Sequence, residues 1–316
     1  MFDLATHRNR WYVISLILLV PGVLALLLWG LNLGIDFTGG TIWELEFQQT
    51  VTTEQVRQAL SAEGRDEATI QISSSNDLSD NVAIIRMEEL PQISDEKQRL
   101  ETALESEIGP FVELQISTVG SSVSSEISEK AVIAVLAASV GILLYIAFAF
   151  RNTQNPLLYG ICAIIAMLHD VLFILGVFAI LGHFFDVQVD ALFVTAILTI
   201  IGFSVHDTIV VFDRIRENLA NQTDRDFEGV VNYSLAQTLV RSVNTSLTVL
   251  FTLLALYLFG GESTRNFVLA LLLGIVIGTF SSIFNASQML VSWEEGDVRR
   301  WWNKLKRRNP KPVAAS

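Results

Sequence analysis

The stretch IIGFSVHDTIVVFDRIREN, residues 200–218, continues an apolar run that is long enough to cross a membrane. It carries His206 and Asp207 well before the charged residues at its end. A carboxylate inside a bilayer is costly and usually marks a functional site. The stretch therefore predicts a membrane helix with a buried ionisable group, and other spans of the chain should supply its partner.

Composition favours an integral membrane protein with one water-soluble part. Of the 316 residues, 51% are hydrophobic and 17% are charged, and the mean hydropathy is +0.46. These values lie outside the usual balance of soluble proteins. The net charge of −12 is concentrated in residues 31–128, which hold 5 Lys and Arg against 18 Asp and Glu. This segment is predicted to be a separate acidic domain, and it lacks the basic face that nucleic-acid binding needs.

Six apolar segments have the length of about 20 residues that a spanning helix requires. The first follows basic residues and so could be a signal peptide, but its apolar run is too long and no A-x-A site follows it. We therefore expect it to remain as a membrane anchor. The predicted spans are Trp11–Leu31, Ala131–Phe150, Pro156–Leu181, Val189–Phe212, Thr238–Phe259 and Phe267–Val291.

Loop charges predict the orientation, because loops rich in Lys and Arg stay in the cytoplasm. Both termini are therefore expected to be cytoplasmic. The chain divides into an N-terminus with the first span (1–31), an extracytoplasmic domain (32–128), spans two to six (129–292) and a basic tail (293–316). The tail, RRWWNKLKRRNPK, either lies on an anionic membrane surface or is a solvated segment that only fixes the topology.

Hydrophobic periodicity changes inside the acidic domain. Alternation in period two predicts strands at 41–47, 69–73, 81–87 and 111–118, and helical spacing with capping residues predicts helices at 51–64 and 93–109. The order βαββαβ is that of a ferredoxin-like α+β unit. The domain contains no His, no Cys and no Gly-rich phosphate loop, so binding or mechanical roles are favoured over chemistry.

No enzyme motif is present elsewhere in the chain. The His-Asp pairs at 169–170 and 206–207 do not form an H-E-x-x-H motif, and adjacent residues point to different faces of a helix. The chain has no G-x-S-x-G, and its one cysteine, Cys162, lies in an apolar run and is expected to serve packing. We expect a protein that is not an enzyme and needs no cofactor or metal.

Two opposite charges are predicted to lie at the same depth in consecutive spans. Asp207 lies 18 residues after Val189, and Arg241 lies 18 residues before Phe259. At 1.5 Å per residue, both are about 27 Å from the outer surface. One interpretation is a static salt bridge that locks two helices. The other is a proton site, because desolvation favours the protonated carboxyl group and a nearby arginine favours the ionised one.

Other polar residues in the spans keep alternatives open. His206 could relay a proton at neutral pH, although packing or hydrogen bonding is the better-supported interpretation. Asp170 lies nearer the bilayer centre, and it either hydrogen-bonds neighbouring helices or belongs to a proton path; the polar run 244–248 has similar alternatives. At the cytoplasmic end of the opening stretch, four residues are expected to be interfacial anchors with local ion pairs: Asp213, Arg214, Arg216 and Glu217.

Three motifs together carry a resemblance that covers essentially the whole chain. GLNLGIDFTGGT (30–41) follows the first span, HDTIVVFDRIREN (206–218) ends the fourth, and QTLVRSVNTS (237–246) opens the fifth. With six spans and a large first outer loop, these motifs resemble the SecD/SecF family of protein-export membrane proteins. VVFDRIREN and the layout of a single span followed by a short domain favour the SecF branch.

The resemblance implies a membrane part similar to half of a resistance–nodulation–division (RND) transporter, completed by a SecD subunit in the cytoplasmic (inner) membrane. It implies association with the SecYEG channel, with YajC and YidC as further candidate partners. It also implies that the proton-motive force completes export of an unfolded preprotein after SecA has acted. The family's proton-transport residues fall on Asp207 and Arg241 here, and His206 stands where Asn is more usual.

The GIDFTGG segment would join the first span to the outer domain, with glycines that permit positive φ and hinge-like geometry. Its residues are Gly34, Ile35, Asp36, Phe37, Thr38, Gly39 and Gly40. A competing interpretation is half of a proton-driven exporter of small molecules or lipids. Such exporters carry two much larger outer loops per chain, whereas this chain has one loop of 98 residues.

Overall fold

The computed structural model describes residues 4–74, 80–90, 95–153, 155–221, 226–261, 264–296 and 300. The chain forms two compact units. One comprises Met1–Asn32 with Ala134–Ser316, and the other is Leu33–Ile133. Most of the predicted basic tail lies outside the described residues, so neither interpretation of it is addressed.

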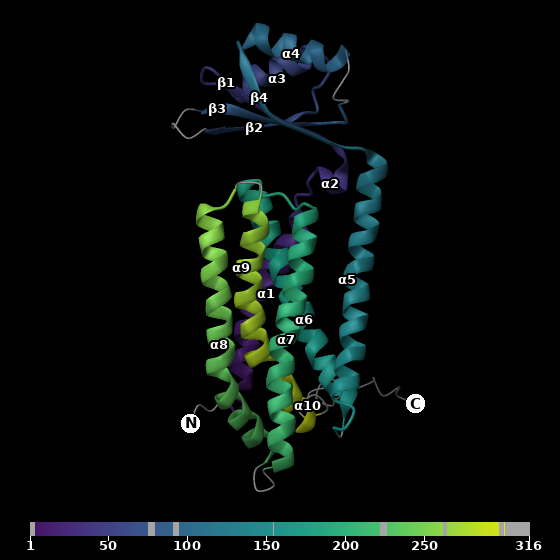
Figure 1. Ribbon diagram of the computed structural model, residues 1–316, viewed down its shortest axis with the longest axis vertical. Coiled ribbons are helices and arrows are strands. Elements are labelled where there is room, and N and C mark those ends of the chain that lie inside the picture. The colour runs from purple at the N-terminus through teal and green to yellow at the C-terminus, as the bar shows by residue number, and fades with distance from the viewer. Residues whose placement is uncertain are drawn as a thin grey trace, which may run out of the picture. The chain divides into compact units, whose positions relative to one another are not determined.

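The smaller unit is a four-stranded antiparallel sheet with two helices on one face (Figure 1). The strand order is β2-β3-β1-β4, with all neighbouring pairs antiparallel. The βαββαβ prediction is confirmed, and the order is that of a split βαβ unit. The elements are β1 (Gly40–Phe47), α3 (Thr53–Ala62), β2 (Thr69–Ser74), β3 (Asp80–Met87), α4 (Asp95–Glu107) and β4 (Phe111–Val119).

The core of this unit follows from the alternation of side chains along β1. Because successive side chains of a strand point to opposite faces, Trp43, Leu45 and Phe47 all reach the helix-covered face and are buried. Leu60 of α3 and Leu100 of α4 are buried in the same cluster. Burying side chains of this size stabilises the unit by about 1.5–3 kcal/mol each.

An ionic link joins α4 to the sheet beside this core. Glu113 of β4 accepts a hydrogen bond from Trp43 Nε1 at 2.7 Å and lies 2.8 Å from Lys97 Nζ of α4. Burial opposes ionisation of Glu113, but the hydrogen bonds from Lys97 and Trp43 outweigh it and hold the pKa of Glu113 below its usual value. The same hydrogen bond to Glu113 raises the pKa of Lys97, against the opposing effect of burial.

The GIDFTGG segment forms a compact turn. Its centre is the short helix α2 (Ile35–Thr38), which ends where Gly39 donates its N–H to the carbonyl of Ile35 at 2.8 Å. Gly39 and Gly40 adopt φ values of +75° and +118°, whereas Gly34 has φ −76°. A Cβ on Gly40 would lie 2.6 Å from the carbonyl oxygen of Met87. The positive φ angles agree with the glycine pattern, and hinge motion at this segment stays a prediction.

Within the described residues, six helices of the chain are long and apolar enough to cross a membrane, which confirms the predicted spans. In chain order, these helices are α1 (Arg8–Trp29), α5 (Ser121–Ala149), α6 (Pro156–Phe185), α7 (Ala191–Asn221), α8 (Phe227–Phe259) and a last span made of α9 (Arg265–Ser281), η2 (Ser282–Ala286) and α10 (Ser287–Glu294).

Several helices extend beyond the apolar segments that predicted them. α8 begins at Phe227 rather than Thr238, and α7 continues past Phe212 to Asn221. Hydropathy detects only the apolar part of a span, whereas the backbone hydrogen bonding of a helix continues into amphipathic ends. The span boundaries were therefore predicted too short at these ends.

Glycines set the closest helix crossings in the bundle. A Cβ on Gly176 of α6 would lie 2.5 Å from the Cα of Gly22 of α1, and one on Gly274 of α9 would lie 2.3 Å from Ile200 of α7. Small residues allow membrane helices to approach at this distance. α1 therefore packs on α6, and α9 packs on α7, with no room for larger side chains.

The last span contains a π-helical turn, η2, which hydrophobic periodicity does not reveal. Such turns are rare and occur often at functional sites. The hydroxyl of Ser282 lies 2.8 Å from Thr208 Oγ1 and 3.0 Å from the carbonyl of Ser204, both on α7. Asn285 accepts a hydrogen bond from Ser15 of α1 at 2.6 Å. The π turn therefore connects the last span with two other helices.

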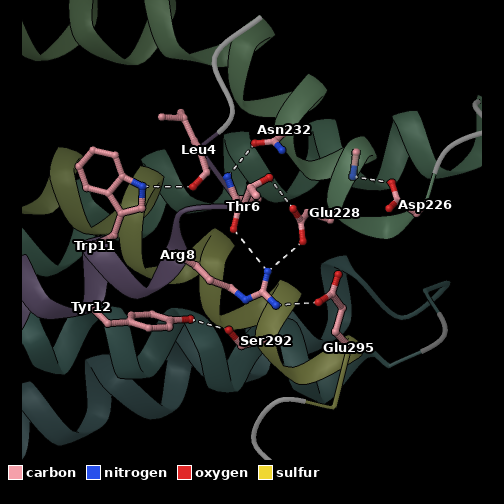
Figure 2. A network of polar contacts seen from close by, with 12 residues as sticks. Leu4, Thr6, Arg8, Trp11, Tyr12, Asp226, Glu228, Asn232, Ser292 and Glu295 are labelled. Atoms are coloured by element: carbon pink, nitrogen blue, oxygen red, sulfur yellow. Dashed lines mark hydrogen bonds and ion pairs between the residues drawn. The ribbon is translucent and has the colours of Figure 1, made fainter.

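A polar cluster ties together the ends of α1, α8 and α10 (Figure 2). The guanidinium of Arg8 binds Glu228 at 2.9 Å and Glu295 at 2.7 Å. The backbone N–H of Ala5 donates to Asn232 Oδ1 at 2.7 Å. In the sequence Arg8 was only one of the basic residues before the first span, and its part in this cluster was not predicted.

Candidate functional site in the helix bundle

Asp207 lies near the middle of α7 and is 7% exposed. Its Oδ1 accepts a hydrogen bond from the hydroxyl of Ser242 on α8 at 2.8 Å. Its Oδ2 is buried and has no hydrogen-bond partner among the described residues. A buried acceptor without a donor is unfavourable, and more so when it is ionised. The carboxyl group is thus fixed through one oxygen, while the other can take up a proton.

Asp207 and Arg241 do not form the expected ion pair. None of the ion pairs between described residues joins them. The two positions nevertheless lie at nearly the same level, because Asp207 contacts Ser242, the residue after Arg241. Consecutive residues of an α-helix point about 100° apart. Ser242 therefore faces α7, and Arg241 is turned to an exposed position on α8.

Arg241 lines a cavity of about 350 Å³ between α7 and α8. Val210 and Thr238, one helical turn from Asp207 and Ser242, belong to its wall, so the cavity adjoins the Asp207 contact. Its volume is enough for several water molecules. The complete lining is Val210, Asp213, Arg214, Glu217, Gln237, Thr238 and Arg241.

The charged cluster at the end of α7 forms the local ion pairs that its spacing predicted. Arg216 lies 2.5 Å from Asp213, and Arg214 lies 2.6 Å from Glu217, each pair three residues apart. Exposed pairs of this kind contribute less than about 1 kcal/mol. Their anchoring at a membrane interface stays a prediction.

Buried hydroxyl groups recur every four residues along α8. Ser234, Thr238, Ser242 and Ser246 share one buried face, because residues four apart lie one above the other on a helix. Ser246 lies 2.5 Å from Thr279 Oγ1 of α9, as Ser242 reaches Asp207 of α7. In the predicted polar run 244–248, only Ser246 is buried. The spacing of four residues in the sequence could have predicted this row of buried hydroxyls.

Asp170 of α6 is 1% exposed and connects three helices. Its Oδ2 accepts hydrogen bonds from Ser204 of α7 at 2.6 Å and from Ser281 of α9 at 2.7 Å. Its Oδ1 lies 3.1 Å from Nδ1 of His169. The geometry agrees with helix-to-helix hydrogen bonding, one of the two interpretations of Asp170, and leaves a role in proton transport as a prediction.

His206 does not join this interior. It is exposed, and the described residues give it no hydrogen bond or ion pair. Its neighbour Asp207 faces the bundle, so the two side chains of this pair point to different surroundings. A relay through His206 stays a prediction. The histidine that contacts a buried carboxylate is His169, which the sequence placed in a His-Asp pair without indicating a role for it.

The chain has six spanning helices and a separate α+β unit, and hydroxyls of neighbouring helices hold two carboxyl groups inside the bundle. These features define a multi-pass membrane protein built around a buried polar centre. Comparison with known proteins narrows this class. The family model described as "Protein export membrane protein SecD/SecF, C-terminal" matches residues 100–296, and the "SecD/SecF GG Motif" matches residues 30–51. The chain belongs to the SecD/SecF family, as a SecF subunit of the protein translocase accessory complex.

The similar proteins include SecF chains that match over nearly their whole length. "Protein translocase subunit SecF" of Thermobaculum terrenum is 55% identical, with 95% of this chain and 96% of the relative covered. The same subunit of Anaerolinea thermophila is 40% identical over 100% of both chains. These relatives favour the translocase over a small-molecule or lipid exporter.

A solved relative shows the same fold inside a longer chain. It is the crystal structure of "SecDF, a translocon-associated membrane protein" from Thermus thermophilus, with a TM-score of 0.79 and 34% identity. The similarity covers 93% of this chain but only 39% of that one. This chain therefore corresponds to one part of the solved protein.

Proposed function

We propose that this chain acts with a SecD subunit to convert the proton-motive force into a late step of protein export. The fused SecDF of Bacillus subtilis, 34% identical to 95% of this chain, supports the pairing, because this chain covers only 39% of it. A SecD chain supplies the remaining helices and completes the bundle. The coupling ion is the proton, and no other cofactor takes part.

The observation that carries the proposal is the half-satisfied carboxyl group of Asp207. When Oδ2 holds a proton, the group is neutral and suits its buried position. When the proton leaves, Oδ2 is ionised without a donor, which favours a rearrangement that provides one. Arg241 is the adjacent cation, on the helix that already contacts Asp207 through Ser242. Movement of α8 that brings Arg241 to Oδ2 links proton release to a change of helix packing.

The energy available is sufficient for such a change. One proton that crosses about 100 mV releases roughly 2.3 kcal/mol. In the proposed arrangement both termini and the cluster Asp213–Glu217 face the cytoplasm, and the chain lies in the inner membrane. The unit Leu33–Ile133 then lies outside. There it binds an unfolded preprotein that emerges from SecYEG after SecA has pushed it, with YajC and YidC as further partners.

Replacement of Asp207 tests this function. Asp207→Asn keeps an acceptor for Ser242 but cannot release a proton, so the variant should insert and assemble normally and lose proton-dependent export. Asp213→Asn, on the same helix but in the exposed ion pair with Arg216, is the matched control and should export normally. Export is measured as protease protection of a preprotein in membrane vesicles that contain SecD. Normal export by Asp207→Asn at an equal protein level would refute the proposal.

A further inference from the structure

His169 is the one histidine of the described spanning segments that contacts a buried carboxylate. Its Nδ1 lies 3.1 Å from Oδ1 of Asp170, and its side chain is 11% exposed. Its second ring nitrogen, Nε2, is buried and has no hydrogen-bond partner among the described residues. A buried ring nitrogen of this kind needs an explanation, because nearly all buried polar atoms are paired.

Donor and acceptor counting places a proton between the two residues. The hydroxyls of Ser204 and Ser281 donate to Oδ2 of Asp170 at 2.6 and 2.7 Å. These two donors occupy Oδ2. Oδ1 and Nδ1 are both acceptors when unprotonated, so their contact requires a hydrogen that one of them carries. We assign it to Nδ1, because three donors then surround the ionised carboxyl group and offset the cost of its burial.

The charge of this pair then depends on Nε2. With Nε2 protonated, an imidazolium faces a carboxylate and the pair is neutral; without that proton the pair is an uncompensated anion. A buried isolated charge is far more costly than a neutral pair. The described groups that interact with Asp170 are His169, Ser204 and Ser281, so no other ionisable side chain compensates it.

The surrounding helices bring no further ionisable group to this pair. In α1 no ionisable residue follows Tyr12, and α9 has none after Arg265 until its end. On α7 the ionisable residues that follow Ser204 most closely are His206, which is exposed, and Asp207, which is engaged with Ser242 of α8. η2 carries none, and α10 has only Glu294, at its far end.

We propose that His169 and Asp170 form a second proton-holding site, in which the exchangeable proton is carried on Nε2 of His169. This inference rests on the proposed proton coupling and adds a site to it. In the step, the Nε2–H bond breaks, its electron pair stays on Nε2, and the proton passes to a water molecule. The hydrogen on Nδ1 stays on Nδ1, hydrogen-bonded to Oδ1 of Asp170, and the pair changes from neutral to a single negative charge.

The site is placed to act on helix packing. Loss of the Nε2 proton leaves Asp170 as a stronger acceptor for Ser204 and Ser281, which belong to α7 and α9. Ser204 lies one turn before Asp207 on the same helix, and its carbonyl accepts from Ser282 of the π turn. Both carboxylates therefore link α7 to its neighbours. Asp170 binds α7 to α6 and α9, and Asp207, which lies on α7, binds it to α8.

Nitrogen NMR tests the site directly. The complex with SecD is labelled with 15N-histidine, and the difference between wild type and His169→Phe isolates the His169 signal. As the pH rises, Nε2 should lose its proton while Nδ1 keeps its own. An Nε2 that stays in one protonation state at every pH at which the complex remains folded would overturn the proposal. The readout does not depend on export, so it stands apart from the Asp207→Asn test.

Export assays separate titration from hydrogen bonding. His169→Gln can still donate an amide hydrogen to Asp170 Oδ1 but cannot titrate. It should lose proton-dependent export and the part of the pH dependence of export that His169 supplies. His183→Phe is the control, because His183 lies on the same helix and stacks on Trp29 at 4.1 Å without a carboxylate. Wild-type rate and pH profile in His169→Gln would show a structural hydrogen bond only and contradict the proposal.

Discussion

At the scale of single residues, hydroxyl groups of neighbouring helices donate to both interior carboxyls of this protein. Asp207 is held by Ser242, and Asp170 by Ser204 and Ser281. Breaking a buried ion pair leaves an uncompensated charge, which is strongly destabilising. A carboxyl group that is held by hydroxyls can change its protonation state at lower cost, because a hydroxyl can rotate and act as donor or acceptor.

The contact between Ser242 and Asp207 can be tested by removing its hydroxyl. Ser242→Ala leaves both oxygens of Asp207 without a donor, so it should reduce export and destabilise the bundle by about 1 kcal/mol, the usual size of such hydrogen bonds in membranes. Thr245→Ala, an exposed hydroxyl on the same helix, is the control. Unfolding in mixed detergent measures the stability. Equal stability and export in both variants would remove the role given to Ser242.

Gly40 offers a second residue-scale test. Gly40→Ala combines a φ of +118° with a Cβ that would lie 2.6 Å from Met87 O. Gly64 has a similar backbone requirement, with φ +77°, but open space around its Cβ. Gly64→Ala should therefore cost only the left-handed strain of about 1–2 kcal/mol, and Gly40→Ala should cost more. Hydrogen exchange of the β1 amides measures both, and equal protection losses would show that the contact with Met87 is unimportant.

Residue-level prediction succeeded where a count along the helix was enough. Equal counts from Asp207 and Arg241 to their span ends predicted that the two residues lie level with each other, and Asp207 contacts the residue after Arg241. Which of two adjacent residues makes the contact depends on the rotation of α8, which such a count does not contain. For the same reason the sequence suggested a role for His206, which is exposed, and none for His169, which contacts Asp170.

At the scale of elements, the fold was predictable where the hydrophobic pattern of the sequence follows the geometry of the element that it forms. Alternation gave the strands of the small unit, and hydropathy gave the six spans. The helix ends and the π turn η2 were not predictable in this way. A π turn shifts the register by one residue through its hydrogen bonding, and no side-chain pattern in the apolar last span reports that shift.

The link between α4 and β4 makes a pH prediction. The pKa of Glu113 is lowered from 4.5, so its stabilising contribution is present above pH 4.5 and is lost as the pH falls through the folded-state pKa. The pKa of Lys97 is raised from 10.5, so its contribution is present below pH 10.5 and is lost as the pH rises through the folded-state pKa. The link should therefore stabilise the small unit evenly between these values.

The variant Lys97→Met tests the link, with Arg99→Met on the exposed face of α4 as control. At pH 7, Lys97→Met should lower the free energy of unfolding by about 1 kcal/mol, because solvent screens a partly exposed pair. The difference from wild type should shrink in strong acid, where Glu113 is protonated. A difference that is independent of pH would indicate lost packing of the lysine stem on Trp43 instead.

The cluster around Arg8 connects three helix ends and gives another element-scale prediction. Arg8→Gln removes the cation between Glu228 and Glu295 and leaves two partly buried carboxylates without it. We expect a loss of a few kcal/mol from the contact of α1 with α8 and α10. Arg10→Gln, an exposed neighbour with the same effect on the charge of the N-terminus, is the control. Limited proteolysis of the N-terminal segment should distinguish the variants, and equal cleavage would contradict this role.

At the scale of the whole molecule, the chain contains two units that are stabilised in different ways. The small unit is stabilised by an apolar core in water. The bundle buries its carboxyls and packs through glycines, because lipid offers no hydrophobic driving force between helices. The chain crosses between the units at residues 32–33 and within α5, at residues 133–134. In the proposed mechanism a change in the bundle reaches the small unit, and these two connections are the covalent links between them.

The most direct test of the central claim is a measurement of proton flux through the complex. Liposomes that contain this chain and SecD are loaded with a pH-sensitive dye, and a membrane potential is applied. Wild type and Asp213→Asn should acidify the interior when the potential drives protons inward, and Asp207→Asn should not. Equal proton flux in Asp207→Asn and wild type would contradict the claim that Asp207 carries the proton.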